Sequence, residues 1–194
     1  HSEIARRARP LWKPDQKVTT PCHDVDRLPM YGMFTWGDAF TARQLLALVT
    51  FNDLVAEAKE QVVKDAGAGA DSSNYATAVA TYLGLAASKL ADGNSMICSW
   101  MPGTKYEVVR TTFSRQALAM TWDFAESNPF AGSSGDFSEQ AHRIAKVLEL
   151  SVPIHAQVGM VSQRDAAASL DIKTVVSPDP PYYDNVGYGI LSDF

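Results

Sequence analysis

The sequence lacks the features of several protein classes. Only two of its 194 residues are cysteines, Cys22 and Cys98, and their spacing does not form a C-x-x-C pair. This argues against a disulfide scaffold and predicts a reduced, cytoplasmic setting. Cys22 and His23 supply only two of the four ligands that a structural zinc site needs, so no metal is expected.

Long apolar runs and a strong basic charge are also missing. No stretch reaches the ~18–20 apolar residues of a membrane span, and no signal-peptide pattern opens the chain. The formal net charge is −5, which argues against a basic nucleic-acid surface across the whole chain. A local positive cluster comprises Arg6, Arg7 and Arg9 with Lys13 and Lys17. A solvated linker is the favoured interpretation of this cluster, and a phosphate-binding arm is the alternative.

The composition that remains is that of a globular domain. Hydrophobic residues make up 46% and charged residues 20% of the chain, which is ordinary for a globular protein. A chain of 194 residues can bury a real core. Because it starts at His1 rather than Met and ends at Phe194 within an apolar and aromatic pattern, we expect a piece of a longer polypeptide, with the remainder of that chain as a partner.

The pattern divides the chain into three regions. Residues 1–36 carry prolines and turn signals too often for long elements, so we expect an irregular linker or packing segment. Residues 37–150 are expected to be mostly helical, and residues 151–194 to form part of an α/β region. Four aromatic residues of the first region should pack onto the core: Trp12, Tyr31, Phe34 and Trp36.

The middle region opens with two strong helix signals. Thr41-Ala42-Arg43-Gln44 matches a capping box, and the helix that it starts should end near Asp65, before Gly67 and Gly69. A second helix is expected over residues 73–90. The short connection between them predicts a helical hairpin.

Two more helices are expected further along. One should run over residues 114–126 and end at Asn128-Pro129, because proline disfavours helix at the residue before it. The next should be capped by Asp136, with an acid three residues on. Residues 96–101 stay open between strand and loop, and residues 106–109 are a candidate strand.

The pattern changes again near the C-terminal end. Residues 155–161 and 172–176 have the composition of strands, and strands that follow helices at short spacing predict an α/β sheet. Ligands of such sheets bind beyond the carboxyl ends of the strands. Asp165 and Asp179 lie at two such ends.

Asp179-Pro180-Pro181-Tyr182 follows the second of these strands. Pro180 and Pro181 have no N–H for a strand ladder, so they stop the strand and fix φ. A carboxylate, free carbonyl groups and an aromatic ring are then held stiffly at the edge of a sheet. Such a group suits the binding of a flat, hydrogen-bonding ligand.

This stretch resembles the D-P-P-Y motif of S-adenosylmethionine-dependent amino-methyltransferases. The longer run 179–185, with Leu191-Ser192-Asp193-Phe194, resembles the DUF1156-type adenine-specific DNA methyltransferases, and residues 31–33, 40–46 and 122–130 are similar to stretches upstream of the motif there. The resemblance implies a helical insertion followed by part of a Rossmann-like methyltransferase sheet. It also implies S-adenosylmethionine as cofactor and DNA as partner.

The resemblance assigns a role to each motif residue. Asp179 and the carbonyl of Pro180 would accept the two hydrogens of the adenine amine and so direct its lone pair toward the methyl group. The rigid Pro180-Pro181 unit would preorganise these acceptors. Tyr182 would stack on a flipped base, an interaction worth about 1–3 kcal/mol. The acid at the first position favours adenine over cytosine.

A second stretch, Asn128 to Gly135, resembles the D-P-F-x-G-x-G loop that cradles the cofactor. Asn replaces the acid, and a helix rather than a strand is expected before it, so a turn between helices is the favoured interpretation. Asn128 and Gly132 stay candidate cofactor contacts, with Asp165 as a candidate contact to the adenine ring. The family pattern places its glycine loop upstream of His1, so this chain alone is expected to be inactive and is not expected to bind S-adenosylmethionine tightly.

An alternative comes from a different class of protein. Pro180-Pro181-Tyr182-Tyr183 satisfies P-P-x-Y, a polyproline ligand for small domains with aromatic grooves. The chain would then be a non-catalytic helical interaction domain. This interpretation needs an exposed segment, whereas strand residues precede the motif.

Overall fold

The protein is described by a computed structural model, in which the described part is rich in helix. It holds three α-helices, α2 to α4, and one two-stranded antiparallel sheet. The sheet expected near the C-terminal end, over residues 155–161 and 172–176, lies outside the described residues. The described residues are 12–18, 27–67, 69–103, 105, 107–115, 117–133 and 135–151, with the single residues 3, 165, 177, 191 and 194.

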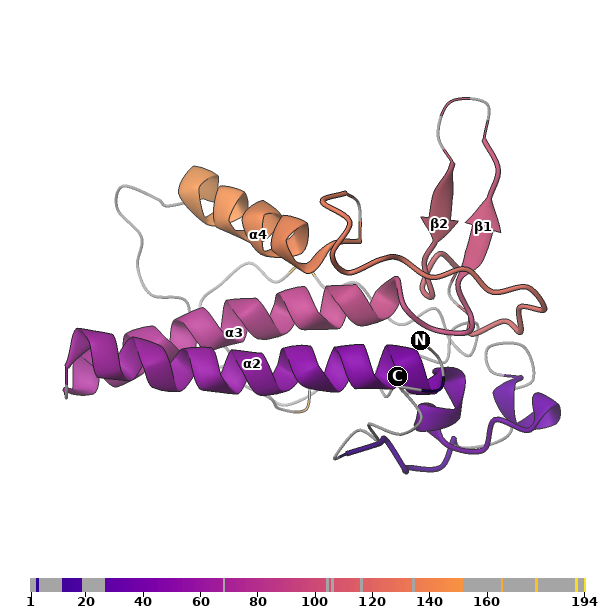
Figure 1. Cartoon of the computed structure of the whole chain (residues 1–194), viewed down its shortest axis with the longest axis horizontal. Helices are drawn as coiled ribbons and strands as arrows, with labels where there is room; N and C mark the ends of the chain where they lie inside the picture. Colours follow the sequence, from indigo (N-terminus) through magenta and orange to yellow (C-terminus); the bar gives the residue numbers. More distant parts are fainter. Residues whose placement is uncertain are drawn as a thin grey trace.

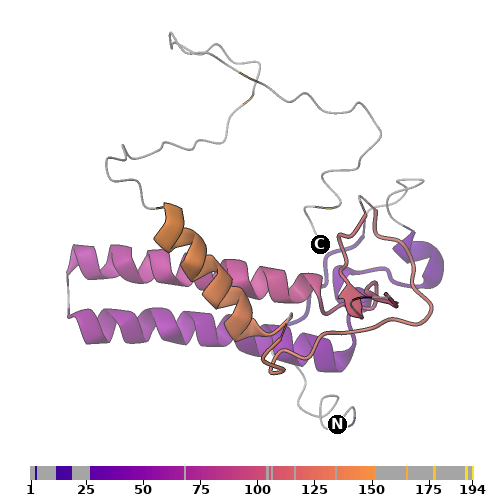
Figure 2. The same ribbon diagram turned by 90° about the horizontal axis from the view of Figure 1, so that it is seen from above.

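Two long helices form the expected hairpin. Helix α2 spans Ala42–Ala66 and α3 spans Ala70–Asp92, and they lie antiparallel side by side (Figures 1 and 2). The capping box is confirmed: Thr41 Oγ1 accepts a hydrogen bond from Gln44 N at 3.2 Å, and Gln44 Oε1 accepts one from Thr41 N at 2.8 Å. Helix α2 stops at Gly67, whose φ of 79° lies in the region that favours glycine.

Irregular segments cover one end of this hairpin, as the prolines predict. Two 3₁₀ turns, η1 (Leu28–Tyr31) and η2 (Trp36–Ala39), are joined to the preceding segment by a bridge between Lys17 and Thr35. Of the four aromatic residues expected to enter the core, only Trp36 does so, while the other three remain exposed. The core cluster consists of Val18, Leu28, Trp36, Ala39, Ile97 and Leu118.

A short hairpin projects beside the end of α3 (Figure 1). Strand β1 (Ser99–Met101) pairs with β2 (Val108–Arg110), with Ser99 opposite Arg110. The undecided stretch 96–101 is therefore a strand in its second half, and the candidate strand at 106–109 is confirmed at Val108 and Val109.

A buried polar cluster joins this hairpin to α3. Thr112 Oγ1 donates to the carbonyl oxygen of Asp92 at 2.9 Å and lies 2.8 Å from Ser95 Oγ. The thiol of Cys98 donates to the same Asp92 carbonyl at 3.3 Å. Because buried polar groups are stable only when paired, these contacts fix how the hairpin leaves the helix.

The prediction of a helix over residues 114–126 is wrong. The described residues of this segment form bends and irregular backbone, and Phe124 forms an antiparallel bridge with Ser99. Thr121 Oγ1 donates to the Ile97 carbonyl at 2.8 Å, and Ala125 N donates to the Cys98 carbonyl at 3.0 Å. These bonds to the residues just before β1 use a backbone donor that a helix would need, and tertiary contacts of this kind override local helix preference.

The last described helix, α4 (Phe137–Ser151), packs across α3 (Figure 2). Its predicted cap is confirmed, because Asp136 Oδ1 accepts from Ser138 N at 2.7 Å and from Glu139 N at 3.3 Å. Phe137 stacks on Phe51 of α2 with ring centroids 4.5 Å apart, which ties the start of α4 to the hairpin. None of the helices described is both long and apolar enough to cross a bilayer.

Candidate functional site

The predicted base-binding residues, Asp179 to Tyr182, lie outside the described residues. Asp165 is described and is exposed. Two residues of the L-S-D-F run that follows the motif, Leu191 and Phe194, are described as well. The roles assigned to the D-P-P-Y residues therefore stay predictions.

Phe194 is inserted among aromatic side chains of the core. Its ring centroid lies 5.9 Å from that of Trp36, 5.3 Å from that of Phe40 and 5.4 Å from that of Phe113. Leu191 packs against the same core cluster. Aromatic pairs in such geometries are worth about 0.5–1.5 kcal/mol each beyond the area they bury, so these contacts fix the ring of Phe194 to the core next to η2.

The loop from Asn128 to Gly135 begins as a tight turn. Asn128 Oδ1 accepts from Phe130 N at 3.0 Å, and the Asn128 carbonyl accepts from Ala131 N at 3.3 Å. The chain before this loop is not the expected helix, but residues 125–128 form no strand either. The missing acid at Asn128 and the family pattern, which places the glycine loop upstream of His1, also argue against a cofactor loop here.

Asp136 supplies a carboxylate to the backbone of this loop and of α4. Its Oδ2 accepts from Gly132 N at 2.9 Å, and its Oδ1 caps α4. The hydrogen bond from Gly132, joined by those from Ser138 and Glu139, outweighs the effect of burial and lowers the pKa of Asp136 below its ordinary value. The N–H groups that a bound anion would need at this helix start are therefore already taken.

Close packing accounts for the last glycine of the loop. A Cβ at Gly135 would lie 2.5 Å from Ser127 Cβ, and the φ of Gly135 is +99°. Ser127 N in turn donates to the Gly93 carbonyl at 3.1 Å. The loop thus needs this glycine for its own fold. Because the N–H groups of Gly132 and of the start of α4 already donate to Asp136, we interpret Asn128 and Gly132 as parts of a structural turn and not as cofactor contacts.

A pocket of about 590 Å³ lies next to the loop. The end of α3, the β1–β2 hairpin, the loop and α4 surround it, and Lys89, Trp100, Glu126, Asn128 and Arg143 are among its lining residues. Its volume falls within the range of about 300–1,000 Å³ usual for small-molecule sites. Among the described residues, Asn128 is the sequence-predicted site residue on its wall.

Glu126 is the lining residue that sequence reasoning missed. Its Oε1 pairs with Arg43 at the start of α2, while its Oε2 is buried and has no hydrogen-bond partner among the residues that the structure describes. A buried carboxylate oxygen left unpaired is costly, and it can accept a hydrogen bond from a hydroxyl or amine of a ligand. The available signal was an acid two residues before Asn-Pro-Phe.

Comparison with protein-family models, with curated proteins and with solved structures finds no match to this chain. Within the described residues, no group of three or more His, Cys, Asp or Glu side chains is placed to hold a metal ion. The function is therefore inferred from the motif residues of the sequence and from the geometry of the described residues.

Proposed function

We propose that this chain is part of an S-adenosylmethionine-dependent methyltransferase that acts on the exocyclic amine of adenine in DNA. The observation that carries the proposal is the run Asp179-Pro180-Pro181-Tyr182-Tyr183-Asp184-Asn185 with the trailing Leu191-Ser192-Asp193-Phe194. The contacts of Phe194 with Trp36 and Phe40 support it, because a base-binding segment has to be held against a rigid core.

The chemistry proposed for the motif concerns the adenine nitrogen. Its lone pair is delocalised into the ring, which makes the amine a poor nucleophile. Asp179 and the carbonyl of Pro180 accept its two hydrogens and hold the lone pair in line with the methyl group, while Tyr182 stacks on the base. The cofactor supplies that methyl group as a sulfonium.

The described residues do not offer a fit for this cofactor in the Asn128 loop, because Asp136 already occupies the N–H of Gly132 and the first turn of α4. We therefore assign no step to this loop. In this proposal the cofactor is bound outside the Asn128 loop, and Asp179 with the carbonyl of Pro180 supplies the acceptors for the base.

The substitution Asp179→Ala in the full-length protein tests the proposal. Loss of one preorganised hydrogen-bonding group at a reacting centre costs on the order of 10²–10³-fold in rate. We expect incorporation of labelled methyl groups into adenine of DNA to fall by at least that factor, with an unchanged circular dichroism spectrum.

Asp171→Ala is the matched control, since it removes an aspartate eight residues earlier in the sequence. Methyl incorporation that is equal in the Asp179→Ala variant and the wild type would end the catalytic interpretation. The P-P-x-Y alternative makes the opposite prediction: capture by proline-binding domains should then depend on Tyr183.

A further inference from the structure

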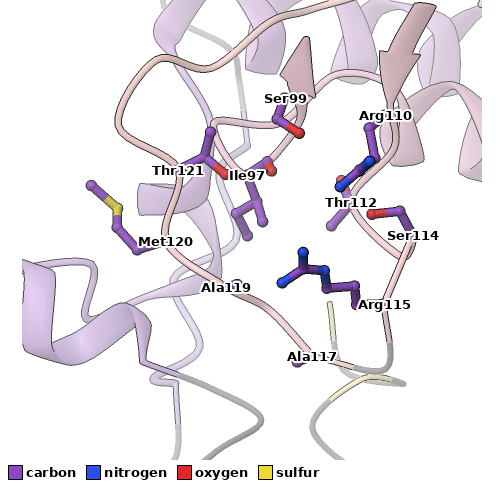
Figure 3. Close-up of a pocket in the computed structure, with 10 residues that line it drawn as sticks. All are labelled: Ile97, Ser99, Arg110, Thr112, Ser114, Arg115, Ala117, Ala119, Met120 and Thr121. Carbon is purple, nitrogen blue, oxygen red and sulfur yellow. Dashed lines mark hydrogen bonds between the residues drawn. The ribbon is translucent and has the colours of Figure 1, made fainter. Parts of the chain in front are cut away.

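A second pocket, of about 220 Å³, lies between the β1–β2 hairpin and the irregular segment that follows it. Figure 3 shows the guanidinium groups of Arg110 and Arg115 both directed into this space, together with the hydroxyls of Ser99 and Ser114. The full lining is Ile97, Ser99, Arg110, Thr112, Ser114, Arg115, Ala117, Ala119, Met120 and Thr121, with no carboxylate among these residues.

Two of the hydroxyls on its wall are used within the protein. Thr112 Oγ1 donates to the Asp92 carbonyl and Thr121 Oγ1 donates to the Ile97 carbonyl. These two bonds hold the walls of the pocket in place. In the part of the chain that the structure describes, Ser99 and Ser114 have no side-chain hydrogen bond, so their hydroxyls are available to a ligand.

Neither arginine forms an ion pair with an acid of the described residues. Arg110 makes a contact of 3.4 Å from a terminal guanidinium nitrogen to the sulfur of Met101, a weak acceptor. Arg115 is exposed and forms no ion pair with any residue that the structure describes. Apart from the weak contact of Arg110 with Met101, the N–H groups of both guanidinium groups can donate to a ligand.

This arrangement suits a phosphate oxyanion. Planar guanidinium groups bind phosphate through paired, charge-assisted hydrogen bonds, and serine hydroxyls add further donors. A volume of about 220 Å³ falls below the roughly 300 Å³ at which sites for whole small molecules begin. The pocket thus matches a single phosphate group better than a complete nucleotide.

An adjoining pocket extends this surface. It measures about 260 Å³, shares Arg115 with the first pocket, and adds Arg27 and Tyr31. The ring of Tyr31 meets that of Trp122 edge to face at 6.1 Å, and Trp122 is 82% exposed. Exposed aromatic rings beside cations are the usual platform for unpaired bases.

We propose that this face binds a single strand of DNA, with a backbone phosphate between Arg110 and Arg115 and an unpaired base against Tyr31 and Trp122. The choice of DNA as the polymer rests on the proposed function. The phosphate site itself rests on the geometry of the pocket.

Fluorescence anisotropy of a labelled oligonucleotide of about 12 thymidines, a length within the range of single-strand sites, tests this proposal on the 194-residue chain. Arg115→Gln and Arg110→Gln should each weaken binding on the order of tenfold, as expected for the loss of a charged hydrogen-bonding group. In the double variant, the slope of log K against the logarithm of the salt concentration should become less negative by about 0.7, which is the value for one single-strand phosphate contact.

Lys64→Gln is the control for charge alone. Lys64 is exposed and lies in the last turn of α2, at the opposite end of that helix from the β1–β2 hairpin (Figure 1). It should leave the affinity within about twofold of the wild type. Equal weakening by Lys64→Gln and Arg115→Gln would overturn the proposal, since binding would then follow net charge. Absence of oligonucleotide binding would overturn it too, including the case in which inorganic phosphate alone binds.

Trp122→Ala distinguishes the contribution of base stacking from that of phosphate binding. It should weaken oligonucleotide binding while leaving competition by inorganic phosphate unchanged, and an unchanged oligonucleotide affinity would remove the base platform from the proposal. None of these measurements needs methyl transfer. This binding can therefore fail while the proposed function stands, and the Asp179→Ala experiment can fail while this binding stands.

Discussion

Asp38 shows how one side chain fixes the turn on which the core rests. Its Oδ2 accepts hydrogen bonds from Phe34 N at 3.1 Å and Thr35 N at 2.9 Å, and its Oδ1 pairs with Lys13 at 2.8 Å. Burial acts to raise the pKa of Asp38, but the hydrogen bonds from Lys13 and Thr35 outweigh it and lower the pKa to about 2. The ionised form thus holds η2 in place.

A pH dependence of stability follows from this lowered pKa. The contribution of Asp38 is fully present above its ordinary pKa of 3.8 and is lost as the pH falls through about 2. Because the side chain is 31% exposed, solvent screening reduces the contribution to roughly 1 kcal/mol. Denaturant unfolding of the wild type and of Asp38→Asn should show a difference in stability near pH 6 that shrinks toward pH 2.

Asp53→Asn serves as the control at an exposed aspartate of α2. It should not reproduce this pH-dependent difference. A difference between wild type and Asp38→Asn that stays constant from pH 6 to pH 2 would contradict the assignment.

At the scale of elements, the start of α2 is set by Thr41. Its Oγ1 accepts from Gln44 N, which satisfies a donor that the first turn of a helix otherwise leaves unpaired. Thr41→Ala should lower the free energy of unfolding by about 1 kcal/mol. Chemical denaturation monitored by circular dichroism measures this change.

Thr50→Ala makes the same chemical change inside the same helix. Thr50 is exposed, and its Oγ1 donates to the Leu46 carbonyl, a carbonyl of the helix itself. Because alanine has the higher helix propensity, this variant should be as stable as the wild type or slightly more stable. The capping interpretation would be wrong if Thr41→Ala cost no more stability than Thr50→Ala.

The sequence predicts well those elements whose stabilising contacts join residues close together in the chain. Thr41 and Asp136 make their capping contacts within three residues along the chain, so α2 and the start of α4 could be recognised from spacing alone. The segment 114–126 could not, because its decisive partners are the carbonyls of Ile97 and Cys98. Its apolar spacing resembled a helix face, whereas Trp122 is in fact exposed.

The same contrast applies to sites at the scale of the whole molecule. D-P-P-Y is a contiguous run, and sequence alone suggests its chemistry. Arg110 and Arg115 line one pocket because the segment after β2 returns to bridge with β1 at Ser99, and Glu126 lines a pocket together with residues of α3, the β1–β2 hairpin and α4. Such convergence depends on tertiary contacts that spacing does not encode.

The whole chain should be unable to bind its proposed cofactor alone. Asp136 occupies the donors of the Asn128 loop, so isothermal titration of the 194-residue chain with S-adenosylmethionine should show no micromolar binding. A micromolar dissociation constant that Asn128→Ala abolishes would instead make this loop the cofactor site.

The position of Phe194 has a consequence for the order in which the chain is made. Its ring meets that of Trp36, a residue 158 positions earlier (194 − 36). At a synthesis rate of about 5–20 residues per second, Trp36 is made roughly 8–30 s before its partner. During that time Phe194 cannot cover the rings of Trp36 and Phe40, so a nascent chain exposes this aromatic patch until Phe194 has been made.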